Sequence, residues 1–211
     1  MPEGPPYSSS FELAFSKVME SEGGFVDHPN DPGGATKYGV SLRFLRGLHK
    51  DRPDIWFRIF GTELPSVGMV RNLSIDKAKA VGYQCFWLPA GCSAISGLDI
   101  PYALFDMAFN MGVRQAVKIL QRAMNDAMPS KYKRLKVDGR FGSRTLAALH
   151  GTLVGCGDNA VLTAIRLRRQ DFYESLVRKN NRFRPFLKGW LRRAVEATQD
   201  TADLPDEKEI K

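Results

Sequence analysis

Apolar residues recur at intervals of three and four positions along most of this chain, and this helical period is the feature that most constrains its fold. The clearest case is the stretch 113–128. Its apolar face consists of Ala116, Val117, Leu120, Ala123 and Met124. No long run alternates between apolar and polar residues, as a half-buried strand would. The sequence therefore predicts an all-α or nearly all-α protein.

The same period predicts further helices on both sides of this stretch. The first is expected to begin at a Ser8–Ser10 cap and to end at about Ser21, before two glycines. The others are predicted at 41–49, 74–87, 143–150, 161–179 and 186–198, with one more that Gly112 closes. A chain of 211 residues can bury most of its apolar surface without disulfides, as one large domain or two small ones.

The segment 161–195 concentrates the positive charge of the chain, with ten basic residues against two acidic ones, while the whole chain has a net charge of +8. In the helix predicted there, the residues expected to be buried are Val161, Ile165, Phe172, Leu176 and Val177. Those expected on a solvated face are Arg166, Arg169 and Lys179. Such a basic surface suggests a polyanionic partner, either nucleic acid or an anionic cell envelope. The envelope is preferred, because no aromatic side chains are expected to face the same way as the arginines.

Three cysteines, Cys85, Cys92 and Cys156, indicate a reduced protein with buried thiols, because an odd number does not build a disulfide framework. A pair between Cys85 and Cys92 is the less favoured alternative. No CxxC pattern is present, so a cysteine zinc site is not expected.

The start of the chain and its hydropathy bear on where the protein acts. Residues 1–10 are expected to be a disordered leader, and they lack the basic and apolar regions of a signal peptide. No apolar run approaches the roughly 20 residues that a membrane-spanning helix needs. We expect synthesis in the cytoplasm, so a site of action outside it would require a release route other than a signal peptide.

The segment 23–38 shows neither helical nor strand period, and its glycines and prolines predict a structured turn region, with a small β-hairpin at most. Glu22 stands where the first helix meets this segment. The apolar helix face would partly desolvate its carboxyl group, which favours the protonated form that a general acid needs. A loop folding back could place Asp31 and Thr36 across a cleft from Glu22, as glycoside hydrolysis requires.

Other interpretations of these residues are open at the level of composition. A glutamate before two glycines can be a simple helix end, and an aspartate in Asn-Asp-Pro can be a turn former. Asp27, His28 and Asp31 could hold a metal ion, but their spacing is loose. A hydrogen-bonded turn is preferred there, and no metal or other cofactor is expected.

The run Glu22-Gly-Gly-Phe-Val-Asp-His-Pro-Asn-Asp-Pro-Gly-Gly-Ala-Thr-Lys-Tyr-Gly-Val40 resembles the motif of glycoside hydrolase family 108. Three later runs resemble the C-terminal, so-called peptidoglycan-binding region of that family. They begin at Phe105, Ala116 and Val137, and Lys188-Gly-Trp-Leu-Arg-Arg193 resembles its closing motif. The resemblance spans about residues 11–195. Members of this family are N-acetylmuramidases of phage endolysins and of bacterial proteins that assist secretion. The resemblance therefore implies action in the periplasm or cell wall, after release through a holin or a dedicated export route.

The resemblance implies an all-α, lysozyme-like fold with Glu22 as the catalytic acid. The predicted reaction is hydrolysis of the β-1,4 bond between N-acetylmuramic acid and N-acetylglucosamine in peptidoglycan, a bacteriolytic lysozyme activity. Residues 11–97 would form the catalytic region and 98–195 a helical peptidoglycan-binding region packed as a second lobe. An acidic tail at 196–211 would follow.

The roles of Asp31 and Thr36 are inferred rather than implied by the family. Phage lysozymes of another family carry Glu, eight residues, Asp, five residues and Thr, whereas the second gap here is four. Asp31, or a water held by Asp31 and Thr36, would complete attack at the anomeric carbon, by inversion or retention. Tyr38, Tyr102 and Asn110 are candidates for lining the groove. Asn110 suits an N-acetyl group, or equally a helix-end cap.

Two function classes compete with the enzyme. One is a non-catalytic wall-binding module with a decayed N-terminal half, which the intact Glu22, Asp31 and Thr36 argue against. The other is a nucleic-acid binder resting on the basic segment. The tryptophans at 56, 87 and 190 are expected to be core anchors rather than sugar platforms. A monomer is expected, and phage and bacterial origins fit the sequence equally well.

Overall fold

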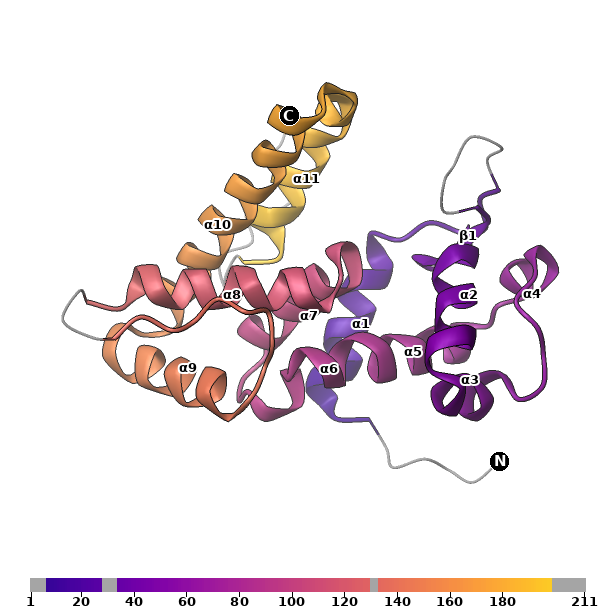
Figure 1. Ribbon diagram of the computed structural model, residues 1–211, viewed down its shortest axis with the longest axis horizontal. Helices are drawn as coiled ribbons and strands as arrows, with labels where there is room; N and C mark the ends of the chain where they lie inside the picture. Colours follow the sequence, from indigo (N-terminus) through magenta and orange to yellow (C-terminus); the bar gives the residue numbers. More distant parts are fainter. Residues whose placement is uncertain (1–6, 28–33, 130–132, 199–211) are drawn as a thin grey trace, which may run out of the picture. The chain divides into compact units, whose positions relative to one another are not determined.

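The computed structural model describes residues 7–27, 34–129 and 133–198 and is helical apart from one small sheet (Figure 1). The predicted all-α class is therefore confirmed, and so is the small hairpin. Contacts divide the chain into two compact units, with the boundary between Pro89 and Ala90. In the described ranges no helix combines the length and the apolar character needed to cross a membrane.

The first unit is built from short helices around the two-stranded sheet. Its elements are α1 (Ser9–Glu20), β1 (Thr36–Lys37), β2 (Val40–Ser41), α2 (Leu42–Asp51), α3 (Pro53–Phe60), α4 (Val67–Arg71), α5 (Ile75–Gly82) and the π-helix η1 (Tyr83–Trp87). The short helix α6 (Leu88–Ala90) crosses the boundary between the units. The sequence did not predict α3 and α4, and the helix predicted at 74–87 is α-helical only as far as Gly82.

Serine caps set the starts of the predicted helices in this unit. The Ser8, Ser41 and Ser74 hydroxyls each accept a hydrogen bond from the backbone N–H three residues later, at 3.3, 3.2 and 3.2 Å. Such caps satisfy donors that the first turn of a helix leaves free. The apolar face of α1 is buried, and Phe11 packs edge-on against Trp87 with ring centroids 5.3 Å apart.

The second unit is organised around one central helix, α8. Its elements are η2 (Cys92–Ala94), α7 (Asp99–Met111), α8 (Val113–Ala127), α9 (Ser143–Cys156), α10 (Asp158–Lys179), the 3-10 turn η3 (Asn181–Phe183) and α11 (Arg184–Glu196). Helix α8 packs against α7, α9 and α10, and α10 and α11 run side by side (Figure 1). The five apolar residues predicted for the buried face of α8 are all fully buried, which confirms that face.

The buried face of α10 differs from the predicted one. It consists of Val161, Leu162, Ile165, Arg169 and Tyr173. Phe172, Leu176 and Val177 are only half-buried, so their predicted burial was wrong. Arg169, predicted to be solvated, is fully buried. The hydrophobic pattern could not show this, because a buried arginine depends on a partner that lies far away in sequence.

That partner is Asp106 of α7, which is 2 % exposed. Its Oδ2 lies 2.6 Å from Nη2 of Arg169, and its Oδ1 accepts a hydrogen bond of 2.8 Å from Nε of Arg193 on α11. The Arg169 contact is an ion pair rather than an aligned hydrogen bond, since neither atom has a hydrogen-bond partner among the described residues. One carboxylate thus joins α7, α10 and α11.

Replacing Asp106 tests how much this buried charge cluster stabilises the protein. Asp106→Asn leaves the Arg169 guanidinium buried without a counter-charge, and removing one partner of a buried pair costs about 3–5 kcal/mol. The matched control is Asp126→Asn. It breaks the exposed ion pair between Asp126 and Arg168, the residue before Arg169, and should cost about 0–1 kcal/mol. Urea unfolding measures both, and equal losses would contradict the central role of Asp106.

Candidate active site

Glu22 lies directly after the end of α1, with its side chain half-buried. Helix α1 ends at Glu20, and the Glu22 N–H still donates to the Met19 carbonyl at 3.1 Å, which holds the residue against the last helical turn. Gly23 and Gly24 follow, and a Cβ atom added to either would meet nothing within 4 Å. The glutamate therefore has a fixed backbone, and the two residues after it have no side chain.

A short ladder brings Thr36 and Tyr38 back beside the residues that follow Glu22. The N–H and carbonyl groups of Val26 and Thr36 exchange hydrogen bonds of 2.9 and 2.8 Å, and the Tyr38 N–H donates to Gly23 at 3.3 Å. Hydrogen-bonded strands lie about 4.8 Å apart. Three of the predicted site residues, Glu22, Thr36 and Tyr38, thus share one small region of the first unit.

The Thr36 hydroxyl has a defined orientation. It donates its single proton to the Gly34 carbonyl at 3.2 Å. Its oxygen lone pairs are left to accept a hydrogen bond, for example from a water molecule. A hydroxyl of this kind can position water, as the sequence suggested for Thr36.

Tyr38 adopts a backbone conformation that is uncommon for a residue with a side chain. Its φ is +51°, in the left-handed region, at the turn between β1 and β2. The neighbouring Lys37 Nζ lies 5.1 Å from the centre of the Tyr38 ring and donates to the Arg71 carbonyl of α4 at 2.9 Å. These contacts fix the hairpin that adjoins Glu22.

The remaining predicted site residues lie elsewhere. Asp31 and His28 lie outside the described residues, and across the described ranges no group of three or more His, Cys, Asp and Glu side chains could hold a metal ion. Tyr102, half-buried, and Asn110, exposed, belong to α7 in the second unit. The Asn110 amide donates to the Asp106 carbonyl at 2.7 Å, a contact of the helix-end kind, so sugar binding by these two residues stays a prediction.

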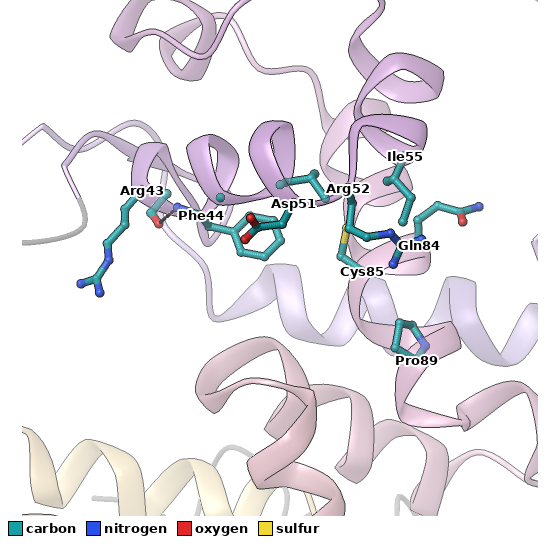
Figure 2. A pocket seen from close by; sticks show the side chains of 11 residues that line it. Arg43, Phe44, Asp51, Arg52, Ile55, Gln84, Cys85 and Pro89 are labelled. Carbon is teal, nitrogen blue, oxygen red and sulfur yellow. Dashed lines mark hydrogen bonds between the residues drawn. The ribbon is translucent and has the colours of Figure 1, made fainter. Parts of the chain in front are cut away.

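A cavity of about 590 Å³ lies between α2, α3 and η1 in the first unit (Figure 2). Ser41, which pairs with Thr36 across the hairpin, also lines this cavity. Phe44, Asp51, Arg52 and Gln84 bring an aromatic ring, a carboxylate, a guanidinium and an amide to its wall. Sequence reasoning missed these residues, because only the fold brings 41–55 and 84–89 together.

Cys85 lies at the wall of this cavity and is a free thiol, as are Cys92 and Cys156. The less favoured Cys85–Cys92 disulfide is therefore not formed in the structure. Burial raises the pKa of Cys85 to about 11, and it raises the pKa of Cys92 further. Both thiols are protonated at neutral pH.

An all-α fold with a half-buried glutamate at a helix end, beside a small sheet, is the architecture of a lysozyme-like protein. Residues 15–112 match the family model Glycosyl hydrolase 108, and residues 115–195 match the model Predicted Peptidoglycan domain. Residues 15–112 of the chain therefore form a glycosyl hydrolase 108 region, and the predicted peptidoglycan domain follows it.

One similar solved structure is that of SagA from Brucella abortus. It shares 25% sequence identity with this chain at a TM-score of 0.61, and the match covers 92% of this chain and 98% of SagA. A comparison with functionally curated proteins gave no match. The structural likeness extends over both units of the chain.

Alkylation of the cysteines tests the raised pKa of Cys85. Because its pKa is about 11 rather than 9.0, its thiolate fraction at pH 8 should be roughly a hundredfold lower than that of an ordinary thiol. The rate at which iodoacetamide modifies Cys85, measured by peptide mass mapping, should therefore rise with pH until the pH passes about 11. Rapid modification of Cys85 at pH 8, or a mass showing a disulfide, would contradict the structure; Cys85→Ser identifies the peptide signal.

Proposed function

We propose that this protein hydrolyses the β-1,4 bond between N-acetylmuramic acid and N-acetylglucosamine in peptidoglycan, with Glu22 as the general acid. The observation that carries the proposal is the placement of Glu22. Its half-buried carboxyl group follows α1 directly and adjoins the ladder that bears Thr36. Membership of a glycosyl hydrolase family and the predicted peptidoglycan domain supply the general class of reaction and substrate.

The first step of the proposed reaction is proton transfer. Glu22 donates its proton to the glycosidic oxygen, the bond to the anomeric carbon of N-acetylmuramic acid breaks, and positive charge develops on that sugar ring. The leaving sugar departs with a free hydroxyl group.

The second step needs a nucleophile on the opposite face of the ring. Thr36 is suited to hold a water molecule there, because its proton is already donated to Gly34 and its lone pairs can accept from the water. We assign Asp31 as the group that takes the proton of this water. The configuration of the released sugar distinguishes this inverting route from a retaining one, in which Asp31 would be the nucleophile.

The exposed cations of α10, η3 and α11 support adsorption to an anionic envelope. They are Arg178, Lys179, Arg182, Arg184, Lys188 and Arg192. Phe183 and Phe186 are exposed among them, and Trp190, only half-buried, stacks on Tyr173 at 5.1 Å. The expected lack of aromatic residues beside these cations was therefore wrong. Trp190 is not a core anchor of the kind formed by Trp56 and Trp87.

Glu22→Gln tests the proposed acid, because an amide cannot donate a proton to the leaving oxygen. The release of reducing ends from purified peptidoglycan should fall at least roughly a hundredfold, the scale of general acid catalysis. Glu20→Gln is the matched control, since Glu20 is the exposed last residue of α1 and should leave activity unchanged. Mass analysis of the wild-type fragments should show reducing N-acetylmuramic acid ends.

Three results would overturn this proposal. Full activity of Glu22→Gln would exclude Glu22 as the acid. No clearing of peptidoglycan by the wild type, together with retention on the wall, would mean that the chain is a non-catalytic binding module. Retention on DNA but not on peptidoglycan would favour the nucleic-acid alternative.

Two substitutions of Thr36 test whether its hydroxyl group positions water or has only a structural role. Thr36→Val removes the oxygen and should lower kcat about tenfold, the effect of one lost hydrogen bond, with little change in KM. Thr36→Ser keeps the hydroxyl and should retain most of the activity. Equal kcat values for the two variants would show that the hydroxyl does not position water.

A further inference from the structure

A second cavity, of about 710 Å³, lies in the second unit between the loop 133–142 and helices α8 and α9. It is distinct from the basic α10–α11 surface and from the region of Glu22. Five cationic side chains line it: Lys133, Arg134, Lys136, Arg140 and Arg144. Asp138 is the one carboxylate among its lining residues.

The loop is held in place by two side-chain amides of α8. Asn125 donates to the Leu135 carbonyl at 2.9 Å and accepts from the Leu135 N–H at 2.7 Å. Gln121, 1 % exposed, donates to the Arg140 carbonyl and to Asp138 Oδ1 and accepts from the Gly139 N–H at 2.9 Å. A loop with this many fixed backbone groups presents its side chains from a rigid frame.

Two glycines fix the loop further. Gly139 has a φ of +75°, and a Cβ atom there would lie 2.6 Å from the Arg114 carbonyl of α8. Gly91 has a φ of +81°, and a Cβ atom there would lie 2.0 Å from the Phe141 ring. The loop therefore packs closely against the unit at both positions, and the cavity is a formed site rather than a gap under a loose segment.

The charges in this cavity are not balanced within the described part of the chain. None of the five cations forms an ion pair with a described carboxylate, and Arg134 donates to the Met128 carbonyl instead. The Asp138 carboxylate accepts hydrogen bonds from Gln121 and from the Arg140 N–H. These hydrogen bonds lower the pKa of its carboxyl group. Exposed cations gathered around a hollow on a well-held backbone create a positive potential, which an anionic ligand relieves.

We propose that this cavity binds the free carboxylates of the stem peptide of peptidoglycan. The proposal rests on the proposed function, because it names the part of the same substrate that this unit takes. The sugar rings of peptidoglycan are uncharged, and the lactyl group of N-acetylmuramic acid is amide-linked to the peptide, so the negative charge lies on the peptide carboxylates. Arginine and lysine are the side chains that recognise carboxylates. All lining residues fall within the predicted peptidoglycan domain.

Binding of two soluble fragments to the full chain tests this assignment. The probes are the disaccharide of N-acetylglucosamine and N-acetylmuramic acid with a tetrapeptide stem, and the same disaccharide without a peptide, its lactyl carboxyl group converted to the uncharged amide. Titration calorimetry should show at least tenfold tighter binding of the peptide-bearing fragment. Amidation of its carboxylates should remove most of that preference.

Charge reversal in the cavity should abolish the preference. The variant is Lys136→Glu, Arg140→Glu and Arg144→Glu together. The matched control is Lys179→Glu, Arg182→Glu and Lys188→Glu, which makes the same change of net charge on the exposed α10–α11 surface of the same unit. The control should bind whole peptidoglycan more weakly at low salt but keep its preference for the peptide-bearing fragment. If the charge-reversed triple variant does not fold, the variant with glutamine at positions 136, 140 and 144 replaces it.

Several results would overturn the assignment: equal affinity for the two fragments, equal loss of preference in the control, or tighter binding of inorganic polyphosphate than of the tetrapeptide fragment. The proposed function is measured separately, by reducing ends released from peptide-free glycan strands. Release without a stem-peptide preference refutes only the cavity assignment. A preference without release refutes only the muramidase.

Discussion

The buried carboxylate of Asp106 is the interaction on which the second unit depends. Asp106 lies within the residues that match the hydrolase family, whereas Arg169 and Arg193 lie within the predicted peptidoglycan domain. Its charge therefore joins side chains of two regions that sequence comparison separates. Helix α7, the last helix of the hydrolase region, also packs along α8, the first helix of the peptidoglycan region. Helices from both matched regions thus contribute to the core of the second unit.

The first unit places the half-buried carboxyl group of Glu22 directly after a helix end. The last turn of α1 fixes the Glu22 backbone, and two glycines follow it. The ladder between Val26 and Thr36 then returns the chain to the same place. A few backbone hydrogen bonds, rather than a large sheet, thus bring together groups that are more than ten residues apart.

Local chemistry explains what could be predicted from the sequence. Apolar spacing located α1, α2 and α8, and the glycine-rich run located the turn region after Glu22. The prediction failed where a residue's role depends on a distant partner. Arg169 resembles a surface arginine until Asp106 is placed beside it, and Gln121 and Asn125 resemble surface amides until the loop 133–142 returns to them. The cavity near Ser41 likewise exists only because η1 packs close to α2.

The shared core has a consequence for building chimeric enzymes from this family. A junction placed between residues 112 and 115, where the two family matches meet, would separate Asp106 from both of its arginines. Each half would then carry a buried charge whose partner had been replaced by a foreign surface. A junction near Pro89 leaves that cluster intact, together with the contact between Gly91 and Phe141. The segment that can be exchanged as a unit thus begins near Pro89, because it must include Asp106 together with its two arginines. The end of the family match does not define it.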